Sequence, residues 1–136
     1  MNKFVTLFSG PDNKSYFKDE DPGIGSEEPL GSYSKKFPAA GMKFRIFKAG
    51  NRFDWHNAPQ PQFIIYLEGE VEVEASGGEK RVFRPGDVLF ANDLKGAGHI
   101  TTTLTDGRSI IVMTQDEEKD ETWKQPLSFN LNGTTI

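Results

Sequence analysis

The sequence contains no cysteine and only two histidines among its 136 residues. Without cysteine, disulfides, thiolate catalysis and zinc–thiolate sites are excluded. The formal net charge is −4 and no run of basic residues occurs, so we expect no nucleic-acid partner. The apolar stretch at residues 4–8 is too short and too mixed for a signal peptide or a spanning helix. These features predict a cytoplasmic protein with no membrane partner.

Hydrophobic, turn-forming and aromatic residues are, by contrast, well represented. Hydrophobic residues make up 35% of the chain, and phenylalanine is the dominant aromatic with 11 copies. A chain of this length forms one domain, and this composition is sufficient for a core. The 14 glycines and 8 prolines imply frequent turns, which favour an all-β fold over long helices.

Alternating and doubly apolar segments predict a series of short strands. We expect strands over residues 3–8, 43–48, 62–67, 71–74, 81–84, 88–90, 100–104 and 109–115. The segment 62–67 is apolar on both faces, which is typical of a strand at the centre of a barrel or sandwich. No segment predicts a helix longer than about two turns. Eight or more closely spaced strands indicate a closed or double-sheet β architecture.

Two irregular segments lie outside this regular region. Residues 9–40 are acidic and rich in proline and glycine, with a short strand expected near residues 16–18. We interpret them as an arm on this domain or on a second subunit, with a lid over the barrel as the alternative. Residues 116–122 are expected to form one helical turn, and 123–136 a last strand or extended segment. The single domain thus divides into 1–41, 42–115 and 116–136.

Both histidines occur in spaced motifs that resemble the two motifs of the cupin superfamily, a small jelly-roll barrel. The first cupin motif has two histidines, a glutamate and flanking glycines, and its spacing is matched by Gly50, His56, Ala58, Gln62 and Gly69. Ala58 stands at the second histidine and Gln62 at the glutamate. The resemblance covers roughly residues 42–115 and implies an all-β fold, a double-stranded β-helix or jelly-roll barrel.

The second cupin motif is matched less closely. Gly86 opens it, and the segment Gly96-Ala97-Gly98-His99 supplies its histidine. Asn92 replaces the proline, Leu94 and Lys95 form a two-residue insertion, and Thr103 stands at the asparagine.

In cupins the motif residues point into the barrel and hold a divalent metal, so the resemblance implies His56, Gln62 and His99 as ligands. Imidazole suits iron, manganese, nickel and zinc, whereas a neutral amide is a weak ligand. We therefore expect such a metal to be weakly held or absent. The triad of two histidines and one carboxylate would require Asp54 or Asp93 to turn inward. A metal-free pocket in which the imidazoles bind or protonate a ligand is the alternative.

Three further residues are candidates for lining the pocket. Trp55 precedes His56, Gln60 lies near the expected mouth, and Tyr66 shares a strand face with Gln62. Packing of Trp55 against the arm, and a core position for Tyr66, are the structural alternatives. No residue is assigned a catalytic role by the sequence.

Three functions are compatible with these motifs. The first is a barrel that binds a small organic molecule, with isomerase, lyase or oxygenase chemistry if it is an enzyme. The second is a non-catalytic binding or sensor module. The third is a dimeric scaffold, since cupins commonly dimerise through sheet edges or exchanged N-terminal strands, for which residues 4–8 are suited. Fold alone does not choose among these functions, and a homodimer is expected in each.

Overall fold

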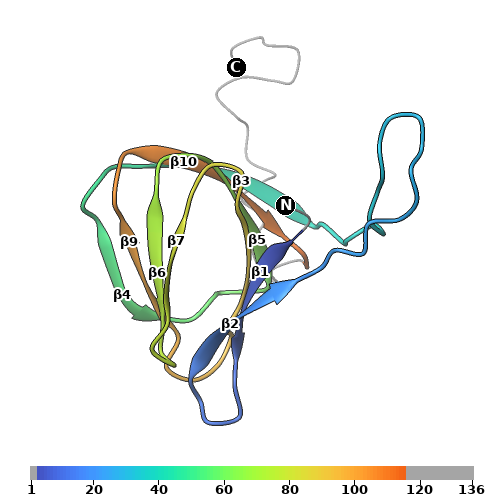
Figure 1. Cartoon of the computed structure of the whole chain (residues 1–136). Helices are drawn as coiled ribbons and strands as arrows, with labels where there is room; N and C mark the ends of the chain where they lie inside the picture. Colours follow the sequence, from blue (N-terminus) through green and yellow to red (C-terminus); the bar gives the residue numbers. More distant parts are fainter. Residues whose placement is uncertain (1–2, 116–136) are drawn as a thin grey trace.

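Ten β-strands and no helix occur in the described part of the computed structural model, residues 3–115 (Figure 1). The expectations for residues 116–136 lie outside the described residues. The strands are β1 (Phe4–Ser9), β2 (Ser15–Glu20), β3 (Gly41–Phe47), β4 (Arg52–His56), β5 (Gln62–Glu68), β6 (Val71–Ala75), β7 (Lys80–Phe83), β8 (Val88–Asn92), β9 (His99–Thr103) and β10 (Gly107–Met113).

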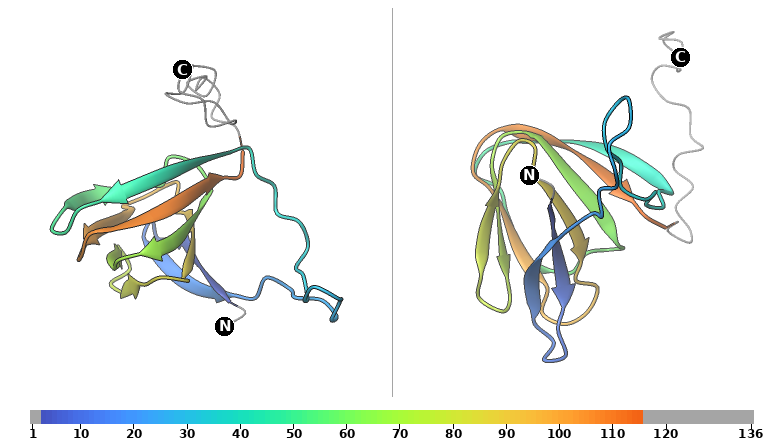
Figure 2. Two further views of the ribbon diagram at one scale, coloured as in Figure 1. Left: turned by 90° about the horizontal axis from the view of Figure 1, so that it is seen from above. Right: turned by 45° about the vertical axis from the view of Figure 1, so that its right-hand side comes forward.

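The strands form two sheets whose order is that of a jelly roll. One sheet runs β2-β1-β8-β5-β10-β3 and the other runs β4-β9-β6-β7. Along β3 to β10, all connections except β6–β7 pass from one sheet to the other. Two interlocking four-stranded sets of this kind make the eight-stranded jelly roll of cupins and related proteins. The predicted fold class is therefore confirmed, and Figure 2 shows the two layers around the interior.

Alternation along the strands builds the core between these sheets. In β6 the valines and alanine, Val71, Val73 and Ala75, are buried while the intervening glutamates are only partly so. Strand β5 contributes Ile64 and Tyr66 to the same core. Because alternate side chains of a strand point to opposite faces, these positions identify the inner face of each sheet.

The predicted strands are confirmed, but β4 was missed by the sequence analysis. Its pairing with β9 shifts register between Phe53 and His56, so an extra residue interrupts the alternation. The strand is also the edge of its sheet and most of its residues are exposed. An exposed, bulged edge strand carries no period-two hydrophobic signal, and it is this strand that holds His56.

The segment interpreted as an arm contains one full strand and a projecting loop. Strand β2 pairs with β1, which in turn pairs with β8 in parallel. Residues 21–40 then extend away from the barrel, on the side opposite β4 and β9 (Figures 1 and 2). The loop therefore does not cover the end of β4. The described structure shows an arm rather than a lid over the barrel.

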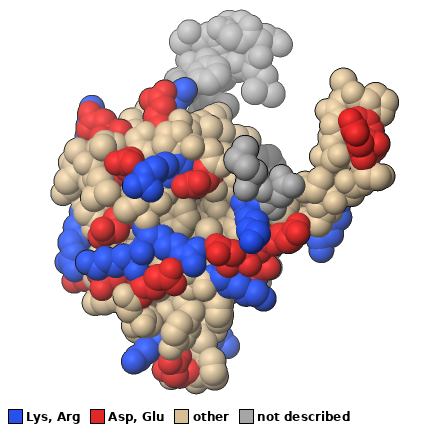
Figure 3. Space-filling view, in the orientation of Figure 1, with Lys and Arg blue, Asp and Glu red and all other residues tan. Residues whose placement is uncertain are grey.

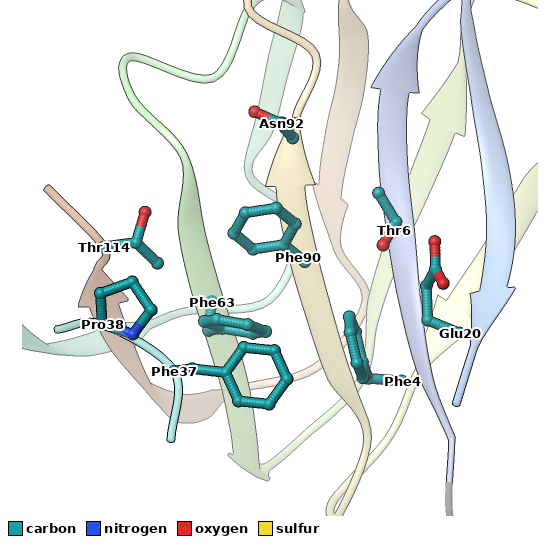
Figure 4. A pocket seen from close by; sticks show the side chains of 9 residues that line it. All are labelled: Phe4, Thr6, Glu20, Phe37, Pro38, Phe63, Phe90, Asn92 and Thr114. Atoms are coloured by element: carbon teal, nitrogen blue, oxygen red, sulfur yellow. The ribbon is translucent and has the colours of Figure 1, made fainter. Parts of the chain in front are cut away.

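The outer face of the six-stranded sheet carries an apolar hollow where the loop returns to the barrel. Its volume is about 390 Å³, and four phenylalanines line it together with Pro38 (Figure 4): Phe4, Phe37, Phe63 and Phe90. Phe37 from the loop packs edge-on against Phe4 and Phe63. This hollow anchors the base of the loop on the sheet and lies on the opposite face from the core.

The described surface carries charges of both signs. Figure 3 shows basic and acidic side chains interspersed over the barrel face, and several form pairs such as Arg81 with Asp19. Within residues 3–115, no helix has the length and apolar character needed to span a bilayer.

Candidate functional site

His56 and His99 are brought together by the pairing of two strands. His56 is the last residue of β4, His99 is the first of β9, and their Cα atoms are register partners. The two imidazole rings lie with their centroids 4.2 Å apart and their planes at 54°. Histidines that are 43 residues apart in the sequence therefore form one pair, as the motif spacing predicts.

The pair lies on the inner side of the barrel at one end. His99 is in register with Ala75, a core residue, and only 6% of its surface is exposed. Short connections join β4 to β5 and β8 to β9, so the ends of these strands meet at the same end of the barrel. The histidine pair thus occupies the end where β4 and β8 finish and β5 and β9 begin.

Each imidazole is oriented through its Nδ1 atom. Nδ1 of His56 lies 2.8 Å from the carbonyl oxygen of Asp54, which can only accept a hydrogen bond. Nδ1 of His99 lies 2.5 Å from Oδ2 of Asp93. With the proton on Nδ1, the Nε2 atom of both rings is left as an acceptor or a metal ligand.

Asp93 is the buried carboxylate of this site. It has no exposed surface, and its second oxygen, Oδ1, accepts a hydrogen bond from the backbone N–H of Ala58 at 3.3 Å. Asn57 adds a side-chain donor to the Asp93 carbonyl oxygen. Of the two aspartates that the sequence analysis considered, Asp93 turns inward, while Asp54 is exposed and pairs with Arg52.

Phe53 completes the surroundings of His56. Its ring stacks on the imidazole with centroids 3.8 Å apart and planes at 20°. Desolvation lowers the pKa of His56 below its ordinary value of 6.5; the hydrogen bond to the Asp54 carbonyl works in the opposite direction. Phe53 itself is 64% exposed and His56 is partly exposed, whereas His99 is buried, so His56 is the member of the pair that faces the barrel surface.

The donor set fits a weak metal site rather than a three-ligand centre. Two imidazole Nε2 atoms can coordinate one ion, and the Asp93–His99 hydrogen bond is typical of support behind a metal-bound histidine. However, no group of three His, Cys, Asp or Glu side chains suited to a metal occurs within residues 3–115. Catalytic zinc sites usually have three protein ligands. A third ligand here would have to be the Gln62 amide or an exogenous molecule.

The other predicted site residues fall into two groups. Gln62 begins β5, half-buried at the same barrel end as the histidines, and Gln60 is 8% exposed in the preceding connection. The Oε1 atom of Gln60 is buried without a hydrogen-bond partner among the described residues. Trp55 is 48% exposed next to His56.

Tyr66 belongs to a different part of the interior. It lies four residues along β5 from Gln62, about 13 Å further into the barrel. Its ring stacks on Phe83 with centroids 5.3 Å apart, and it is 1% exposed. Tyr66 is therefore a core residue, which is the structural alternative given in the sequence analysis. Its ring is separated from the histidine pair along the strand.

The positioning role of Asp93 could have been inferred only in part. The residue lies six positions before His99, directly before the two-residue insertion that disturbs the second motif. A buried hydrogen bond between them requires the 93–98 connection to fold back on itself. Positive φ angles at Gly96 and Gly98 permit that path. The two glycines were therefore the available signal.

The strand order and the motif positions together define a cupin-like jelly-roll barrel. No family model matches the chain. A curated protein from Aspergillus oryzae, named Oryzines biosynthesis cluster protein J, is 40% identical over 45 residues. That stretch is 33% of this chain and 24% of the other protein, so the chain spans about a quarter of the curated relative it matches.

Solved structures with a similar arrangement of strands include an RmlC-like cupin from Desulfovibrio desulfuricans. It is 18% identical, the match covers 83% of this chain and 82% of that one, and the TM-score is 0.41. A conserved protein of unknown function from Streptococcus pyogenes is 14% identical over 57% of this chain and 76% of its own, with a TM-score of 0.43. The jelly-roll assignment rests on the strand order given above.

Proposed function

We propose that the barrel binds a small organic molecule at the His56–His99 pair. The observation that carries this proposal is that two adjacent imidazole rings are both oriented through Nδ1, which leaves the Nε2 atom of each ring as an acceptor at one barrel end. Each ring is held before any ligand arrives, so binding costs little additional ordering of these side chains. Phe53 supplies an apolar surface stacked on the His56 ring.

Proton transfer is the chemistry that these residues would support if the protein is an enzyme. The lowered pKa of His56 keeps its imidazole neutral near pH 7, so Nε2 can accept a proton from a bound hydroxyl or carbon acid. The buried Asp93 carboxylate fixes the ring of His99 and balances the charge gained when its Nε2 is protonated. Isomerase or lyase chemistry fits this pair; non-catalytic binding uses the same contacts.

A divalent transition metal held by His56 and His99 is a second candidate for the same site. The free Nε2 atoms and the carboxylate behind His99 favour it. When bound, such an ion would act as a Lewis acid on an oxygen of the ligand. Gln62, at the same barrel end, is the third ligand we assign, with low affinity because an amide oxygen is neutral.

We further propose that the protein is a homodimer through strand β3. Residues 4–8, which the sequence analysis favoured for this role, form β1 between β2 and β8 and are not at an edge. Strand β3 is an edge, and its outer side chains Met42, Phe44 and Ile46 are 54%, 79% and 82% exposed. An edge strand can pair with its own copy about a two-fold axis, which also covers this apolar row.

Nuclear magnetic resonance of the full-length protein tests the binding proposal. A panel of small hydroxy acids, keto acids and sugars would be added while the imidazole 15N signals of both histidines are followed. We expect a binding compound to shift the Nε2 signals, and its binding to be lost in the His56→Ala/His99→Ala double variant. A Phe63→Leu variant on the outer face serves as the control. Compounds that shift only residues around Phe63 would show that the histidine pair is not the binding site.

A further inference from the structure

One arginine lies inside the barrel without a carboxylate partner among residues 3–115. Four of the five arginines have a carboxylate oxygen between 2.7 and 3.5 Å away: Arg52, Arg81, Arg84 and Arg108. Arg45 has no such partner within residues 3–115, and its Nη2 atom is buried without a hydrogen-bond partner among those residues. Since arginine does not lose its proton in proteins, this is a partly buried positive charge that no described carboxylate balances.

Arg45 lies in a row of hydrogen-bond donors that spans three adjacent strands, β3, β10 and β5. Ser109 on β10 is the register partner of Arg45 on β3 and of Tyr66 on β5. Ser109 and Tyr66 are each 1% exposed. Nε of Arg45 donates to Oγ of Ser109 at 2.9 Å, and the guanidinium lies over the Phe47 ring at 5.3 Å. The guanidinium is therefore held toward the interior, with Nη2 still available.

The chemistry of this row matches an anion. The Ser109 hydroxyl accepts from Arg45 and keeps its own proton to donate, and the Tyr66 hydroxyl is a further donor. Burial raises the pKa of Tyr66 to about 12, although the charge of Arg45 and a hydrogen bond from Arg45 to the phenol work in the opposite direction, so the phenol keeps its proton at neutral pH. A single guanidinium balances one negative charge, which favours a carboxylate over a doubly charged phosphate.

We infer that Arg45, Ser109 and Tyr66 form a carboxylate-binding subsite inside the barrel, and that the ligand is a small carboxylic acid. The inference rests on the proposed function, because it names the ligand class of the same barrel. The subsite is on the inner face of the six-stranded sheet, whereas the histidine pair is on the opposite sheet. Tyr66 also lies about 13 Å along β5 from Gln62 at the histidine end, and packed sheets lie about 10 Å apart, so the carboxylate would bind away from the histidines and only an elongated acid would contact both.

Acetate and its neutral counterpart acetamide are the probes that test the subsite. Each would be titrated into the full-length protein while the 15Nε–H signal of Arg45 is recorded. We expect acetate to shift this signal saturably and to bind at least about tenfold more tightly than acetamide. Arg45→Met should weaken acetate binding at least about tenfold, and Arg45→Lys by less. The control Arg52→Met, on the exposed edge strand β4, should leave acetate binding unchanged.

Several outcomes would overturn the subsite. These are no saturable acetate binding to the wild type, equal binding of acetamide, tighter binding of inorganic phosphate, or unchanged binding in Arg45→Met. If Arg45→Met fails to fold, Tyr66→Phe replaces it and must weaken acetate binding.

The His56→Ala/His99→Ala variant separates the two proposals. If this double variant still binds acetate but binds no larger ligand, both proposals are supported. If larger ligands are lost in the double variant but retained by Arg45→Met, the subsite alone is rejected.

Discussion

The carboxylate of Asp93 and the imidazole of His99 form a buried pair in which Oδ2 lies 2.5 Å from Nδ1. We expect Asp93→Asn to lower the free energy of unfolding by about 2 kcal/mol, because an amide weakens a charge-assisted hydrogen bond in a buried site. Urea unfolding at pH 7 measures the change. Asp54→Asn is the matched control, since Asp54 is exposed and its pair with Arg52 is worth about 0.5 kcal/mol. Equal losses in the two variants would contradict the role of the buried pair.

Gly98 lies where the chain turns into β9, with φ at +75°. A Cβ atom at this position would overlap the carbonyl oxygen of His56, so Gly98→Ala must push β4 away from β9. We expect a loss of about 3 kcal/mol or more, together with altered imidazole signals of both histidines. Gly50→Ala provides the comparison, because Gly50 has φ +85° but open space around it. That variant should lose about 1 kcal/mol. A Gly98→Ala loss no larger than this would show that the close approach is unimportant.

Protonation of His56 should destabilise the fold. The pKa of His56 is lower in the folded protein than its ordinary value of 6.5, so the unfolded chain binds the proton more readily. The stability that depends on neutral His56 is therefore present above pH 6.5 and is lost as the pH falls through the folded pKa. We expect the wild-type Tm to fall more than that of His56→Gln between about pH 7.5 and pH 5. Parallel pH profiles of Tm would show that His56 makes no such contribution.

The metal alternative has a direct test in elemental analysis. If the two Nε2 atoms hold an ion, protein purified without a tag should contain iron, manganese, nickel or zinc, which a chelator removes with ease because the ligands are few. The metal should be absent from His56→Ala/His99→Ala. Metal that persists in this double variant would place the ion elsewhere. If the folded wild-type protein binds none of the four ions, the metal alternative is rejected and the metal-free pocket is retained.

Dimerisation through β3 predicts a response to charge on its outer face. Phe44→Lys combined with Ile46→Lys places like charges opposite each other across a two-fold axis, so a dimer should dissociate to a monomer. Light scattering coupled to size-exclusion chromatography measures the molar mass. The control Phe63→Lys tests whether any charge on the outer sheet face has the same effect. A monomeric wild type, or a double variant that stays dimeric, would reject this interface.

The strand pattern and the fold class could be predicted from local sequence because alternation reports which face of a strand is buried. Val71, Val73 and Ala75 alternate with glutamates, and all three are buried in the structure. The motif spacing likewise predicted that His56 and His99 would meet. Strand β4 escaped prediction because a bulged, exposed edge strand is under no such burial constraint.

Tertiary structure alone decided what surrounds each candidate residue. Asp93 became the partner of His99 only because the connection 93–98 folds back toward β9. Tyr66 shares a strand face with Gln62, yet four residues of rise separate them along β5. Arg45 resembles any exposed basic residue in the sequence, and its burial depends on pairing of β3, β10 and β5, which are distant in the chain. Local sequence thus determines which face of a strand is apolar, whereas long-range register determines which polar groups meet inside the barrel.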